Sequence, residues 1–203
     1  MLYGGAGNDV FVLNADNVRA LAVRNGVDVQ NIARVDGGGG FDTLRFAEPL
    51  VLGLGSALTR LEHLERFDLN GTGGTLQIGN GMVLNATVGD YNRFNTANGW
   101  ALSGAVTGFD GSVSYYQVVV DGTSADTVRL GAGFVKDAGS LTYTGSLTTA
   151  GAYDVYTSAT TRSQVLVRQG VQVLPVLLPA ATITLPEADL LSGFGFLSLA
   201  DAQ

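Results

Sequence analysis

The chain has 203 residues, of which 46% are hydrophobic, and its mean hydropathy is +0.25. This composition supports a folded core and argues against wholesale disorder. The net charge of −7 disfavours binding to nucleic acid or anionic lipid and favours binding to hard cations. The absence of cysteine excludes disulfides, thiolate metal sites and cysteine nucleophiles. No apolar stretch reaches 18 residues, so we expect no membrane-spanning helix.

The first motif is a glycine-rich nonapeptide, GGAGNDVFV, at residues 4–12. It fits the pattern G-G-x-G-x-D-x-U-x, in which U is a large apolar residue, with Asp9 and Phe11 at the defining positions. The glycines permit a tight turn whose carbonyl oxygens converge, and the carboxylate of Asp9 adds a charged oxygen. Carbonyl and carboxylate oxygens are the ligands that Ca²⁺ prefers. The motif therefore predicts half of a calcium site.

The segment that follows predicts a short helix near residues 16–24. Asn14 or Asp16 can cap its start, and apolar residues recur at helical spacing after them. We expect this helix to separate the first motif from the next.

A second nonapeptide, GGGGFDTLR, occupies residues 37–45 and supplies Asp42 and Leu44. It begins 33 residues after the first motif, whereas regular repeats of this kind follow one another every nine residues. The spacing leaves open whether the two turns stack on each other or whether the first one needs a different neighbour.

A second helix is expected near residues 57–66, where leucines recur at helical spacing. Glu62, His63 and Glu65 fall outside this apolar stripe, so a solvated helix face is the favoured interpretation. His63 is the only histidine, and any histidine-dependent catalysis would have to use it. No nucleophile, paired acid or phosphate-binding loop accompanies it, so we expect no enzyme.

Two later segments repeat the turn and strand pattern, DLNGTGGTLQI at residues 68–78 and VDGTSADTVRL at residues 120–130. The strand sequences TLRF, TLQI and TVRL align and alternate in polarity. The second segment contains Asp121 and Asp126, which could bind a further ion or could cap turns. The capping role is the favoured one.

An insertion at about residues 88–104 places Tyr91, Phe94 and Trp100 among asparagines and glycines. Aromatic rings beside amides suit a sugar-binding platform, because rings stack on sugars and amides bond their hydroxyls. The alternative, which we favour, is a loop held down by aromatic anchors.

Both nonapeptides resemble the repeats of the RTX family, and the resemblance implies a right-handed parallel β-roll with calcium between its turns. Carried over to this chain, the implied ligands are Gly4, Ala6, Gly7, Asp9, Gly37, Gly39, Gly40 and Asp42. The order of segments from Val35 to Val173 is similar to the C-terminal region of large type I-secreted bacterial surface proteins, including adhesins. This resemblance implies a secreted, cell-surface location and the type I secretion machinery as a partner.

We therefore expect an all-β fold, a parallel β-roll or β-helix with irregular coils and one or two short helices. Residues 1–173 would form this domain, and residues 174–203 a cap or a tail resembling a secretion signal. The expected function is a non-catalytic, calcium-binding module that folds on extracellular Ca²⁺. The alternatives are a glycan- or surface-binding adhesin domain that uses the Tyr91–Trp100 loop, and an S-layer-like module that associates with itself.

Overall fold

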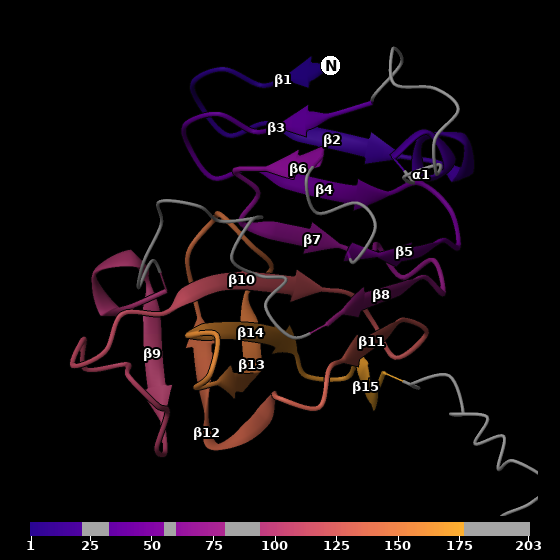
Figure 1. Cartoon of the computed structure of the whole chain (residues 1–203). Coiled ribbons are helices and arrows are strands. Elements are labelled where there is room, and N and C mark those ends of the chain that lie inside the picture. Colours follow the sequence, from indigo (N-terminus) through magenta and orange to yellow (C-terminus); the bar gives the residue numbers. More distant parts are fainter. Residues whose placement is uncertain (22–32, 55–59, 80–93, 177–203) are drawn as a thin grey trace, which may run out of the picture.

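The structure of the chain is a computed structural model that describes residues 1–21, 33–54, 60–79 and 94–176. These residues form strands β1 to β15 in three sheets, with a short helix α1 (Ala15–Leu21) and a 3-10 helix η2 (Thr96–Asn98). The chain is thus mostly β, as its composition indicates (Figure 1). None of the helices in this described part is long and apolar enough to cross a membrane.

The sheets contain three, eight and four strands. The three-stranded sheet has the order β1 (Leu2–Tyr3), β3 (Val35–Asp36), β6 (Leu61–Glu62). The eight-stranded sheet has the order β2 (Val10–Leu13), β4 (Thr43–Phe46), β7 (Arg66–Asp68), β10 (Tyr116–Asp121), β14 (Ser163–Arg168), β13 (Gly151–Ser158), β12 (Val135–Tyr143), β9 (Trp100–Ser103). The four-stranded sheet has the order β15 (Gln172–Pro175), β11 (Thr127–Leu130), β8 (Thr75–Ile78), β5 (Val51–Gly53).

The expected parallel β-roll or β-helix is wrong, because the eight-stranded sheet is mixed. Its strands from β2 to β14 pair in parallel, but β14 with β13, β13 with β12, and β12 with β9 pair antiparallel. Short connections join β12 to β13 and β13 to β14. Short connections of this kind can join only antiparallel neighbours, since a parallel pair needs a longer crossover. The glycine-turn pattern of the first half of the chain therefore does not continue through the strands from β12 to β14.

The three aligned strand sequences do not all belong to one sheet. TLQI (β8) and TVRL (β11) are parallel neighbours in the four-stranded sheet, with Thr75 opposite Thr127. TLRF (β4) instead belongs to the eight-stranded sheet, between β2 and β7. Equal polarity patterns show that a segment has one buried face, but they do not say which sheet it joins.

The helix expected near residues 16–24 is present as α1, within the part of that range that the structure describes. The helix expected near residues 57–66 is wrong for its described part, because Leu61 starts β6 and Arg66 starts β7. Leu61 and Leu64 are both buried, one from the strand and one from the turn after it. The helix-like spacing of these leucines therefore comes from a strand followed by a turn. Residues 55–59 lie outside the described residues.

The expected boundary at residue 173 falls inside β15, and most of the tail, residues 177–203, lies outside the described residues. In the described part of the expected 88–104 insertion, η2 leads into β9, which pairs antiparallel with β12 at the edge of the eight-stranded sheet. The described part of the insertion is thus integrated into the sheet through β9. The main core fills the space between the three sheets, and a second, aromatic cluster lies around Trp100.

Candidate metal centre

The two glycine-rich turns stack directly on each other. Tyr3 pairs with Asp36 before the turns, and Val10 pairs with Thr43 after them, so residues 4–9 and 37–42 are in register. Within the turns, Gly7 N–H donates to the Gly39 carbonyl at 2.7 Å, and Gly39 N–H donates to the Gly5 carbonyl at 2.8 Å. These turns lie above one another on the left side of Figure 1. The 33-residue spacing is therefore compatible with stacking, which the sequence had left open.

Oxygen atoms converge beside Gly4, the first residue of the upper turn. A Cβ atom at Gly4 would collide with the carbonyl oxygen of Gly37 and would lie 2.5 Å from Oδ2 of Asp9. Oδ2 of Asp9 is buried and has no hydrogen-bond partner in the described structure. Gly4 thus leaves a cradle in which a carbonyl and a carboxylate oxygen face the same small space.

The same arrangement recurs beside Gly37. A Cβ atom there would collide with the carbonyl oxygen of His63 and would lie 2.6 Å from Oδ2 of Asp42. His63 has a φ of +50°, a conformation that is uncommon outside glycine. His63 thus supplies the backbone carbonyl of the second cradle, a contribution that its side chain does not reveal in the sequence.

A row of three carboxylates runs along these turns. The Asp9 N–H donates to Oδ1 of Asp42 at 2.8 Å, and the Asp42 N–H donates to Oε2 of Glu65 at 2.7 Å. Each acid directly precedes a strand of the eight-stranded sheet, namely β2, β4 or β7. Glu65 is only 2% exposed, so its expected place on a solvated helix face is wrong. Its position before the strand RFD, matching Asp9 before VFV, is the pattern that could have found it.

Asp36, Glu62 and His63 form a second group beside the turns, with potential ligand atoms within 4.8 Å of one another. Nδ1 of His63 lies 2.7 Å from Oδ1 of Asp36, and the pKa of His63 is raised chiefly by this hydrogen bond. All three side chains are partly exposed. The group is explained by its internal hydrogen bond and its charge, so no ion is needed to account for it.

Asp121 lies elsewhere, in a buried network of donors. Its carboxylate accepts hydrogen bonds from Nε of Arg66 at 2.6 Å and from the hydroxyls of Thr148 and Tyr153. Burial, followed by the charge of Asp121, raises the pKa of the Tyr153 hydroxyl far above its usual range. A carboxylate surrounded by a guanidinium and hydroxyl donors is already neutralised, so Asp121 does not resemble the oxygen cluster at Gly4.

Asp126 also faces donors, since its carboxylate accepts four backbone N–H groups. Those of Gly73 and Gly74 donate to Oδ1 at 2.9 and 3.1 Å. Those of Thr123 and Gly71 donate to Oδ2 at 2.8 and 3.0 Å. Concave groups of amides of this kind bind anions. The favoured capping role thus fits Asp126, and Asp121 and Asp126 are not brought together in one site.

The two described aromatic residues of the insertion lie in the interior. Phe94 and Trp100 are buried, and the Trp100 ring centroid lies 4.7 Å from that of Tyr143 and 5.1 Å from that of Tyr153. Tyr91 lies outside the described residues. Phe94 and Trp100 therefore anchor the insertion to the sheet and do not form an exposed platform.

Comparison with protein-family models, with curated proteins and with solved structures finds no match to this chain.

Proposed function

We propose that the chain is a non-catalytic module that binds Ca²⁺ at the stacked Gly4–Asp9 and Gly37–Asp42 turns and is stabilised by the ion. The observation that carries this proposal is the buried Oδ2 atom of Asp9, which lacks a hydrogen-bond donor and shares the Gly4 cradle with the Gly37 carbonyl. Burying an unpaired charged oxygen costs several kcal/mol. A cation in the cradle would remove this cost and the repulsion between the two oxygens.

The donor set favours Ca²⁺ over other metal ions. The polar atoms that face the two cradles are all oxygens, namely the carbonyls of Gly37 and His63 and Oδ2 of Asp9 and Asp42. Ca²⁺ accepts six to eight such oxygens in flexible geometry, whereas Mg²⁺ requires a near-ideal octahedron at about 2.0–2.1 Å. The candidate ligands are those of the two turns, Gly4, Ala6, Gly7, Asp9, Gly37, Gly39, Gly40 and Asp42. Asp121 and Asp126 are left out because donors already surround their carboxylates.

The biological setting of the module is part of the same proposal. The resemblance of the nonapeptides to RTX repeats supports a place in a type I-secreted protein at the bacterial surface. Calcium outside cells reaches millimolar concentrations and matches weak extracellular sites, with dissociation constants of about 10⁻⁴–10⁻³ M. The turns would then order after export, and the module would support the larger protein without catalysing a reaction.

Thermal unfolding followed by circular dichroism tests the proposal, in chelator, in calcium and in magnesium. Saturation to about 100 times the dissociation constant adds about 2.7 kcal/mol of stability. For a chain of this size, that corresponds to a rise in Tm of roughly 5–10 °C. We expect this rise in calcium and little change in magnesium. Equal melting temperatures in chelator and in calcium would refute calcium binding at the turns.

The Asp9→Asn variant separates the ion from the fold. Its side-chain amide can donate to the Gly37 carbonyl. In chelator, the free energy of unfolding of the variant should therefore exceed that of the wild type by about 1 kcal/mol, and its melting temperature should be higher. It should also lose much of the calcium response. Asp16→Asn, at an exposed position on α1, is the matched control and should keep the wild-type response. An Asp9→Asn variant with a full calcium response would exclude Asp9 as a ligand.

A further inference from the structure

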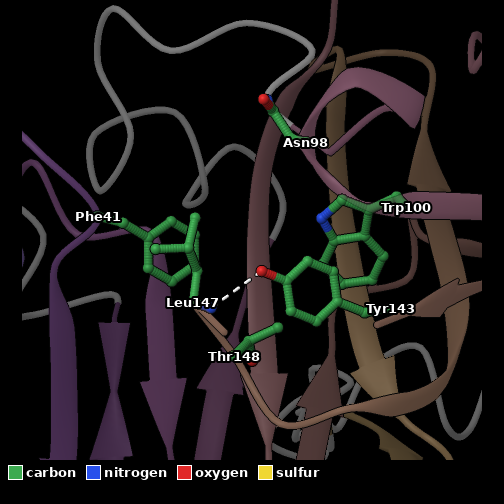
Figure 2. A pocket seen from close by; sticks show the side chains of 6 residues that line it. All are labelled: Phe41, Asn98, Trp100, Tyr143, Leu147 and Thr148. Carbon is green, nitrogen blue, oxygen red and sulfur yellow. Dashed lines mark hydrogen bonds between the residues drawn. The ribbon is translucent and has the colours of Figure 1, made fainter. Parts of the chain in front are cut away.

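A small pocket lies on the aromatic side of the eight-stranded sheet. Its volume is about 210 Å³, and Figure 2 shows the side chains that line it, Phe41, Asn98, Trp100, Tyr143, Leu147 and Thr148. These residues come from the second glycine-rich turn, from η2 and β9, and from the end of β12 with the turn after it. Ligand sites for drug-sized molecules span about 300–1,000 Å³, so this pocket suits a single small ring.

The lining of the pocket is uncharged. None of its six residues is acidic or basic. Asp121, which accepts the Thr148 hydroxyl, is paired with Arg66. Placing a charged ligand here would remove its hydration without supplying an opposite charge. The pocket therefore suits a neutral molecule.

The walls combine aromatic rings with hydrogen-bonding groups. The indole nitrogen of Trp100 and the hydroxyl of Tyr143 lie on the side that faces Phe41 and Leu147 (Figure 2). The Tyr143 oxygen accepts the Leu147 N–H at 2.9 Å, which leaves its own O–H to donate. Asn98 adds an exposed amide at the rim. Phe41, Trp100 and Tyr143 are each at most 6% exposed, so they offer the pocket small apolar edges and not open ring faces. Apolar edges beside donors and acceptors match a molecule that has both an apolar face and several hydroxyls.

We propose that this pocket binds one neutral sugar ring, such as the terminal residue of a surface glycan. One wall is shared with the second glycine-rich turn, because Phe41 stands between Gly40 and Asp42 in the chain. The Phe41 N–H donates to Oδ1 of Asn8 at 2.8 Å, so the stacking of the two turns positions this wall. Calcium should therefore strengthen sugar binding, a consequence that rests on the calcium site proposed above.

Trp100 is the only tryptophan of the chain and reports directly on the pocket. The experiment is a fluorescence titration with glucose, galactose, mannose and N-acetylglucosamine, in calcium and in chelator, supported by ligand-observed NMR. We expect a saturable response to at least one sugar in calcium and at least a threefold weaker affinity in chelator. Leu147→Phe, which narrows the mouth, and Asn98→Ala should each weaken binding about tenfold. Leu102→Phe, at an exposed leucine of β9 that does not line the pocket, is the matched control and should bind like the wild type.

The outcomes separate the pocket from the calcium site. No saturable response to any of the sugars in calcium overturns the proposal, and so does a response that Leu147→Phe leaves unchanged. A response to indole but to none of the sugars also overturns it, because the pocket would then be an apolar one. Equal sugar affinity in calcium and chelator, with calcium-dependent melting intact, overturns only the link through Phe41. Sugar binding without calcium-dependent melting supports the pocket and refutes the calcium site.

Discussion

Two adjacent glycines of the second turn have different requirements. Gly40 has a φ of +144°, and a Cβ atom at this position would collide with the carbonyl of Gly7 in the turn above. At Gly39, by contrast, φ is not positive, and no atom lies within 4 Å of an added Cβ. The stacking of the turns therefore depends on Gly40 and tolerates a side chain at Gly39.

Gly40→Ala should lower the free energy of unfolding by about 2–3 kcal/mol, because it combines strained backbone with a collision against backbone. Gly39→Ala should stay within about 0.5 kcal/mol of the wild type. Urea unfolding in chelator, where no ion contributes, measures both. If the two alanines cost the same, the turns do not approach each other as closely as the structure indicates.

Tyr153 predicts a dependence of stability on alkaline pH. Its pKa is raised first by burial and then by Asp121, relative to an ordinary value of about 10. The unfolded chain therefore loses this proton at lower pH than the folded chain, so its contribution to stability is complete below pH 10 and is lost as the pH rises above 10. Urea unfolding between pH 8 and 11 should show a steeper fall for the wild type than for Tyr153→Phe. Parallel curves would mean that Tyr153 ionises equally in both states.

The sequence predicted Asp9 and Asp42 as neighbours of converging oxygens because the nonapeptide encodes its own turn. It favoured turn capping over ion binding for Asp121 and Asp126, but it could not identify the groups that meet their carboxylates. The difference lies in partners that are remote in the chain, Arg66 for Asp121 and the amides around Gly73 for Asp126. Local sequence determines a turn, but the sheet determines whether donors or acceptors meet it.

Among the elements, the prediction succeeded for strand content and for α1 and failed for topology. Period-2 alternation identified β8 and β11, whose residues alternate between partly exposed and buried. It could not assign β4 to a different sheet, because the choice depends on how many residues separate successive corners. The antiparallel pairing of β12, β13 and β14 was missed because no glycine-rich turn with an aspartate marks that part of the chain.

The elements should respond unequally to calcium. The ion contacts proposed here join the turns between β1 and β2 and between β3 and β4, so opening of these strands should become rarer when it binds. Hydrogen exchange followed by mass spectrometry should show slower exchange in calcium for residues 2–13 and 35–46. The antiparallel strands β12 and β13 serve as an internal control and should change little. Slowing spread evenly over all strands would indicate a global effect and would contradict a localised site.

At the scale of the whole molecule, the proposed calcium site and the proposed sugar pocket meet at Phe41. The calcium turns occupy one end of the parallel strands, and the aromatic cluster covers the antiparallel part, with Phe41 packed edge-on against Phe94 at 6.2 Å between ring centroids. The net charge of −7 suits the first site, and the uncharged lining suits the second. The composition could predict the first property. The second depends on residues 41, 98 and 143, which only the fold brings together.

The stacking of two turns that begin 33 residues apart has a practical consequence for protein engineering. Their register is held by backbone hydrogen bonds within the turns and by the paired strands on both sides, not by the length of chain between β2 and β3. Doubling a flexible connection costs only about 0.6 kcal/mol of closure entropy. A foreign peptide or a reporter domain grafted between β2 and β3 should therefore leave the two candidate metal-binding turns aligned.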